Sequence, residues 1–109
     1  MTKTVDQINS EHRRLQILRA LSLRPLYRAD PRNQRQELEA TGYPMTLTKL
    51  SVECAFLADL GLVDAPAEGL IALTDDGLSV ARGLVKLPGI GTPTEPALRA
   101  RSEWLNEAT

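Results

Sequence analysis

The segment GLVDAPAEGLIALTDDGLSVARGL, residues 61 to 84, constrains the fold of this chain more than any other. Two apolar runs, Leu62-Val63 and Leu70 to Leu73, are too short for helices and bracket a four-residue turn, Pro66 to Gly69. This pattern predicts a β-hairpin. Because an isolated two-stranded hairpin is only marginally stable in water, we expect it to pack against helices.

A helix is expected directly after the hairpin. Thr74 ends the second apolar run and can cap a helix, and Asp75 and Asp76 then lie favourably near the positive N-terminal end. The apolar face of this helix would consist of Leu78, Ala81, Leu84 and Val85.

Two helices are predicted before residue 42. The first covers about residues 5 to 22 and ends before Pro25; its apolar face consists of Ile8, Leu15, Leu18 and Leu21. The second covers about residues 31 to 41. Asp30 can cap it, Pro31 suits its first position, and Gly42 suits its C-terminal end.

A third helix is predicted between a cap at Thr46 and a stop at Gly61, and one stripe of it consists of Leu47, Leu50, Cys54 and Leu57. Met45, Val52 and Phe56 lie opposite that stripe, so either the core covers both sides or an apolar surface remains for a partner. The short connection Gly-Tyr-Pro-Met between the second and third helices is typical of a helix-turn-helix corner. The alternative for these two helices is a plain helical hairpin in a bundle, because its helices have similar lengths.

These elements predict one α+β domain, mostly α-helical, over residues 1 to 86. At 109 residues the chain can bury a hydrophobic core large enough to fold without disulfides or a metal ion. Its single cysteine, Cys54, cannot form an internal disulfide. No apolar run approaches the ~20 residues of a membrane span, and the first residues lack the apolar core of a secretory signal. We therefore expect no membrane partner and a cytoplasmic location. Residues 87 to 109 are expected to form a Gly/Pro linker and a short amphipathic helix that presents Leu98, Trp104 and Leu105.

The residue types needed for catalysis are scarce. His12 is the only histidine and Cys54 the only thiol, and no cluster of carboxylates and histidine has the spacing of a metal site. The sequence GIG at residues 89 to 91 matches a phosphate-binding loop poorly. We therefore expect no enzymatic activity, no cofactor and no bound metal.

Two parts of the sequence resemble known families. The run LADLGLV, followed by GLIALTDDGLSVARGL, resembles the end of the recognition helix, the wing and the next helix of winged helix-turn-helix regulators, particularly the ArsR and MarR types. The layout of residues 12 to 86, which opens with HRRLQIL, also resembles a small protein family of Mu-like phages and prophages. The resemblance implies a winged helix-turn-helix fold of three helices, a two-stranded hairpin wing and a further helix, followed by a C-terminal helical tail.

The resemblance also implies a DNA-binding transcriptional regulator, encoded by a phage or prophage, whose third helix enters the major groove while the hairpin touches the backbone or minor groove. Four residues at the start of that helix lie away from its apolar stripe and are the candidates for base or phosphate contacts: Thr46, Thr48, Lys49 and Ser51. Arg28, Arg32 and Arg35 would contact phosphates from the start of the second helix. Since such proteins usually bind paired half-sites, we expect a homodimer on double-stranded DNA.

The distribution of charge leaves an alternative open. Residues 1 to 50 hold nine Lys and Arg against five Asp and Glu, whereas residues 51 to 109 hold four against nine. A basic half suits DNA, but the third helix has one basic residue beside Glu53 and Asp59, and the hairpin turn offers Glu68 without Lys or Arg. The alternative is a winged-helix protein-interaction module without strong DNA affinity. Its partner interface would consist of Val52, Phe56, Leu98, Trp104 and Leu105.

Overall fold

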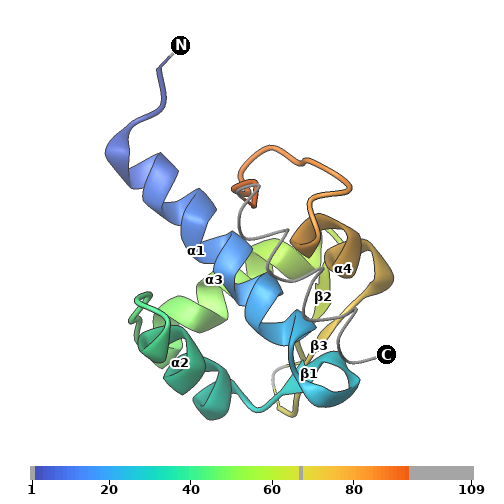
Figure 1. The fold of residues 1–109 in the computed structure, drawn as a ribbon. Coiled ribbons are helices and arrows are strands. Elements are labelled where there is room, and N and C mark those ends of the chain that lie inside the picture. Colours follow the sequence, from blue (N-terminus) through green and yellow to red (C-terminus); the bar gives the residue numbers. More distant parts are fainter. Residues whose placement is uncertain (1, 67, 94–109) are drawn as a thin grey trace.

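A computed structural model describes residues 2–66 and 68–93 of the chain. Over these residues it has four α-helices and a three-stranded antiparallel sheet (Figure 1), which confirms the expected α+β class with mostly helix. The elements in chain order are α1 (Val5–Ser22), η1 (Pro25–Tyr27), β1 (Arg28–Ala29), α2 (Pro31–Ala40), α3 (Leu47–Asp59), β2 (Val63–Asp64), β3 (Ile71–Leu73) and α4 (Asp75–Ala81). None of the helices in the described part of the chain is long and apolar enough to cross a membrane.

Side-chain caps determine where the helices begin. The predicted caps are confirmed: Asp30 accepts a hydrogen bond from the Arg32 N–H, and Thr46 accepts one from the Lys49 N–H. Thr74 accepts a hydrogen bond from the N–H of Gly77 in the same way. The cap of α1 was not predicted: the hydroxyl of Thr4 accepts the N–H of Gln7, and the Gln7 side chain accepts the N–H of Thr4, which is a capping box.

The predicted hairpin is present as β2 and β3, but the sheet has a third strand that was not predicted. Its order is β1-β3-β2, with Ala29 opposite Ile71 and Val63 opposite Leu73. The two-stranded hairpin is therefore confirmed, and β1 is an additional strand of the same sheet. A strand of two residues, Arg28–Ala29, shows no alternation that a sequence could display, and it forms because β3 offers it a free edge.

The core surrounds the C-terminal half of α1, where Ile17, Leu18 and Leu21 are fully buried. The first turns of α1 project from the body, so Ile8 is 40% exposed instead of packing in the core (Figure 1). Leu47 is likewise 41% exposed and does not belong to the buried stripe of α3, because its place in the first turn leaves it beside an open groove.

Helix α4 is shorter than its predicted apolar face. It ends at Ala81, and Gly83 follows in the left-handed conformation with φ 77°. The N–H of Leu84 then donates to the Ser79 carbonyl, which is the hydrogen bond that closes a Schellman motif. Leu84 and Val85 consequently lie beyond the helix and are exposed, not part of its apolar face.

The segment expected to be a linker begins with residues that pack onto α1. Ile90 is buried, and the N–H of Gly91 donates to the Glu11 carbonyl at 2.9 Å. Residues 87 to 93 therefore belong to the packed body. The short amphipathic helix expected after them, with Leu98, Trp104 and Leu105, lies outside the described residues.

Candidate functional site

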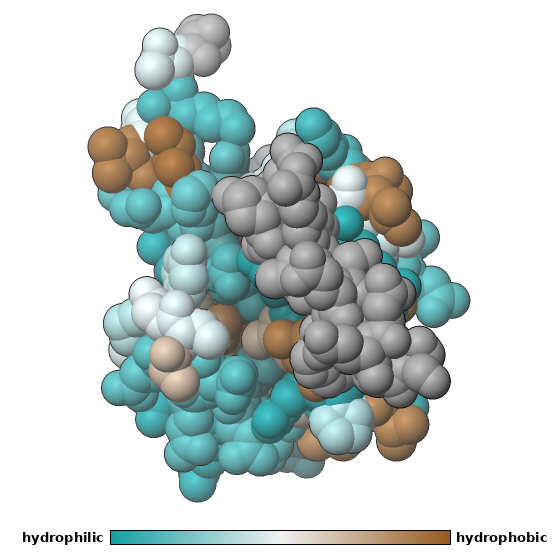
Figure 2. Space-filling view, in the orientation of Figure 1, coloured by the Kyte–Doolittle hydropathy of each residue, from teal (hydrophilic) through white to brown (hydrophobic). Residues whose placement is uncertain are grey.

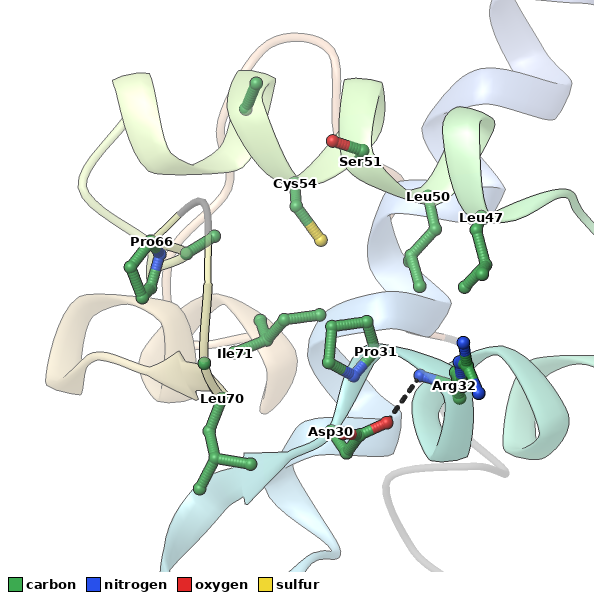
Figure 3. A pocket seen from close by; sticks show the side chains of 13 residues that line it. Asp30, Pro31, Arg32, Leu47, Leu50, Ser51, Cys54, Pro66, Leu70 and Ile71 are labelled. Atoms are coloured by element: carbon green, nitrogen blue, oxygen red, sulfur yellow. Dashed lines mark hydrogen bonds between the residues drawn. The ribbon is translucent and has the colours of Figure 1, made fainter.

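A groove of about 510 Å³ opens between the start of α2, one side of α3 and the β2–β3 hairpin (Figure 3). Leu50 and Cys54 point from α3 toward Ile71 of the hairpin, and all three are buried. Leu47 and Ala55 of α3 line the groove as well and are exposed. The groove therefore has an apolar floor and partly apolar walls, and its volume lies in the range of ligand sites.

Two charged residues line the α2 end of this groove, and they differ in how they are used. Oδ1 of Asp30 accepts a hydrogen bond from the backbone N–H of Arg32 at 2.8 Å, so this carboxylate serves as the cap of α2. Arg32 is itself exposed, and no ion pair of Arg32 is found in the described part of the chain. The guanidinium of Arg32 is therefore the cation that the groove offers to a ligand.

Cys54 contributes an uncharged thiol to the floor. Burial, with a smaller contribution from the neighbouring Glu53 carboxylate, raises the pKa of the Cys54 thiol from 9.0 to about 11. The thiol is therefore protonated at neutral pH and lacks the nucleophilicity of a thiolate. Cys54 acts here as a small apolar residue.

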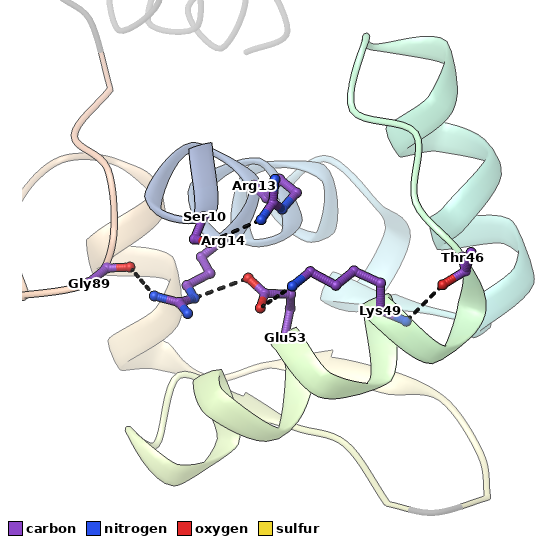
Figure 4. A network of polar contacts seen from close by, with 7 residues as sticks. All are labelled: Ser10, Arg13, Arg14, Thr46, Lys49, Glu53 and Gly89. Carbon is purple, nitrogen blue, oxygen red and sulfur yellow. Dashed lines mark hydrogen bonds and ion pairs between the residues drawn. The ribbon is translucent and has the colours of Figure 1, made fainter. Parts of the chain in front are cut away.

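On another side of α3, a buried ion-pair network involves the predicted DNA-contacting residue Lys49 (Figure 4). Nζ of Lys49 lies 3.7 Å from Oε1 of Glu53, and Nε of Arg14 donates to Oε2 of Glu53 at 3.0 Å. Glu53 was counted among the acidic residues of the third helix that weaken DNA binding, but its side chain is only 3% exposed. Its spacing to Lys49 was visible in the sequence, whereas its pairing with Arg14 across 39 residues was not.

The other predicted DNA-contacting residues fall into three groups. Thr48 and Ser51 are exposed on α3, and Ser51 lines the groove together with Arg32. The hydroxyl of Thr46 is used as the cap of α3. Arg28 is exposed on β1, whereas Arg35 is half-buried and its Nε finds no hydrogen-bond partner in the structure as described.

The two predicted partner-interface residues of α3 also differ from each other. Phe56 is half-buried, and the Arg14 guanidinium lies 3.8 Å from the centroid of its ring. A side chain built at Gly89 would touch the same ring, so Phe56 is covered from within the chain. Val52 is 56% exposed and remains open. The other three predicted interface residues, Leu98, Trp104 and Leu105, are outside the described residues.

On the face that Figure 2 shows, apolar residues lie in separate areas of a mostly hydrophilic surface. Figure 2 shows hydrophilic residues over most of α2, with a more apolar patch over the projecting first turns of α1, where Val5 and Ile8 are exposed. Within residues 2–66 and 68–93, no group of three or more His, Cys, Asp and Glu side chains could hold a metal ion. The groove is thus the feature with the most defined chemistry.

Comparisons of the chain with protein-family models, with curated proteins and with solved structures gave no match.

Proposed function

We propose that this chain is a winged helix-turn-helix domain that binds double-stranded DNA as a transcriptional regulator. The element order α1-β1-α2-α3-β2-β3 and the sheet order β1-β3-β2 support this assignment. In it α2 and α3 are the two helices of the helix-turn-helix, joined by residues 41 to 46, and the β2–β3 hairpin is the wing. A homodimer and a phage or prophage origin belong to the same proposal.

One observation carries the proposal: three elements that a duplex would meet line a single groove. Arg32 comes from the first turn of α2, Ser51 from the exposed side of α3, and Gly69 from the hairpin turn. In a helix-turn-helix the second helix enters the major groove while the first crosses the backbone. Shared exposure of these three elements on one face is what that docking requires.

The side chains then divide by role. Arg28 and Arg32 are exposed and would contact phosphates, which positions the domain without reading sequence. Arg35 would join them only by extending its half-buried side chain. Thr48 and Ser51 would reach base edges. Lys49 would contribute less to DNA affinity than its charge suggests, because the Glu53 carboxylate partly neutralises it.

The second candidate is a protein-interaction module, and a specific observation favours it. The groove floor is apolar, and along α3 the exposed side chains include Leu47, Val52 and Ala55. Phosphates are bound chiefly by Lys and Arg, whereas apolar grooves bind apolar side chains of peptides. The two candidates therefore predict opposite responses to salt.

Titration of a random-sequence duplex by fluorescence anisotropy, at salt concentrations rising from about 50 mM, distinguishes the two candidates. For DNA binding we expect affinity to fall steeply with salt, and Arg32→Gln to make the log–log slope shallower by about one. Lys86→Gln is the matched control, because Lys86 is exposed and does not line the groove. If Arg32→Gln changes the slope no more than Lys86→Gln does, the assignment of Arg32 is wrong. If the folded chain fails to bind at about 50 mM salt, the protein-interaction module is favoured.

A further inference from the structure

The apolar part of the groove lacks an occupant among the described residues. Leu47 and Leu70, which line it, remain 41% and 49% exposed, and the thiol of Cys54 at its floor is uncharged. A duplex would supply mainly sugars, phosphates and polar base edges to this space. The chemistry of the floor instead fits a large apolar side chain.

We propose that the groove is the docking site of the chain's own segment 94–109, with Trp104 as the anchor. Trp104 is the only tryptophan of the chain, and Leu105 follows it directly. A tryptophan inserted into an apolar pocket is the usual anchor of a small interface, because its ring buries a large area at low entropic cost. This places Trp104 on the groove side of α3, not on the side of Phe56, which Arg14 and Gly89 already cover.

The segment starts beside α1, which packs against the helix that lines the groove. The N–H of Gly91 donates to the Glu11 carbonyl of α1 at 2.9 Å, so the segment leaves the body beside α1, and Arg14 of the same helix joins the Gly89 carbonyl to the Glu53 carboxylate of α3. The eleven residues that follow Pro93, up to Trp104, can span about 36 Å when extended. Since an α-helix with its side chains is about 10 to 12 Å in diameter, the segment can cross α3 and reach the groove of the same chain.

The charge at the groove is opposite in sign to the charges of the acidic residues next to Trp104. Arg32 lines the α2 end of the groove, and no ion pair of Arg32 appears in the described residues. Glu103 precedes Trp104 directly, and Glu107 follows it by three residues. Docking of Trp104 would bring these two carboxylates within the neighbourhood of the groove's guanidinium.

The fluorescence of Trp104 in the full chain tests this directly, because no other tryptophan contributes. We expect emission at shorter wavelength and less quenching by acrylamide than in a synthetic peptide of residues 94–109. Ala55→Glu places a charge in the groove wall at an exposed position and should return both readings to those of the peptide. Val52→Glu is the matched control, because it changes an exposed residue of the same helix that does not line the groove. Circular dichroism verifies that both variants fold.

Three results would each overturn the proposal. Peptide-like emission in the unmodified chain would show that Trp104 is not docked. A shift caused by Val52→Glu and not by Ala55→Glu would place Trp104 on the other face of α3. Emission that returns to the peptide value on dilution would mean that the groove holds the segment of a second copy.

Discussion

Arg14 of α1 and Glu53 of α3 form a nearly buried ion pair, with Nε donating to Oε2 at 3.0 Å (Figure 4). The side chains are 18% and 3% exposed. The same guanidinium donates to the Gly89 carbonyl and lies over the Phe56 ring. One arginine therefore fixes α1, α3 and residues 87 to 93 relative to one another, and it orients the helix that forms the groove wall.

Removing one partner of this pair should destabilise the fold strongly. Arg14→Met leaves the buried Glu53 carboxylate with Lys49, at 3.7 Å, as its one cation among residues 2–66 and 68–93, so we expect the free energy of unfolding in urea to fall by about 3 kcal/mol. The double variant Arg14→Met with Glu53→Met should recover most of that loss. Lys3→Met, which breaks the more exposed pair with Glu11, should cost less than about 1 kcal/mol. An equal effect of the Arg14 and Lys3 variants would contradict the role of Arg14.

Gly77 should not tolerate a side chain. A Cβ at this position would overlap the carbonyl oxygen of Leu62, which already accepts the N–H of Thr74, and would press on the Leu73 side chain. We expect Gly77→Ala to lower the free energy of unfolding by about 2 to 3 kcal/mol, as overpacking of a close contact does. Asp76→Ala, at an exposed position of the same helix, should cost at most about 1 kcal/mol. If thermal or urea unfolding ranks the two variants in the opposite order, the close approach of α4 to Leu62 is wrong.

Cys54 should make stability depend on alkaline pH. Its pKa is about 11 in the folded chain against 9.0 for an exposed thiol, so the unfolded state ionises first. Its contribution to stability is therefore complete below pH 9 and is lost as the pH rises from 9 to 11. The measurement is urea unfolding of the reduced chain and of Cys54→Ala across that range. The difference in free energy between them should shrink with pH, and parallel profiles would contradict the burial of the thiol.

Releasing the C-terminal segment should strengthen DNA binding. Trp104 docked in the groove would cover Ser51 and Arg32, so the binding-competent state is only a fraction of the population. If that fraction is about one tenth, Trp104→Ser should lower the dissociation constant for a duplex about tenfold. This expectation depends on both proposals, whereas the fluorescence of Trp104 depends on docking alone. Unchanged affinity, with docking shown by fluorescence, would mean that the segment and the duplex do not compete.

The local elements could be predicted because their signals are local. Asp30, Thr46 and Thr74 each cap a helix through a backbone N–H two or three residues away. The β2–β3 hairpin follows from two apolar runs around a turn. In each case, the residues that decide the structure are neighbours in the chain.

The contacts that shape the groove could not be predicted because they join distant residues. Strand β1 exists only through its pairing with β3, in which Ala29 lies opposite Ile71. Helical spacing placed Leu47 in the core, whereas the structure leaves it at the edge of the groove. Its exposure depends on where α2 and the hairpin end, and periodicity within α3 carries no information about that.

A map of the DNA-contacting surface by NMR tests whether the domain binds a duplex through α2, α3 and the hairpin. Isotope-labelled full chain, and its Trp104→Ser variant, would be titrated with a short duplex at about 50 mM salt, where electrostatic attraction is strong. We expect the amide signals of Arg32, Thr48, Ser51 and Gly69 to shift together, because the start of α2, the exposed side of α3 and the hairpin share one face. Absence of shifts in both proteins, or shifts confined to the projecting first turns of α1, would contradict it.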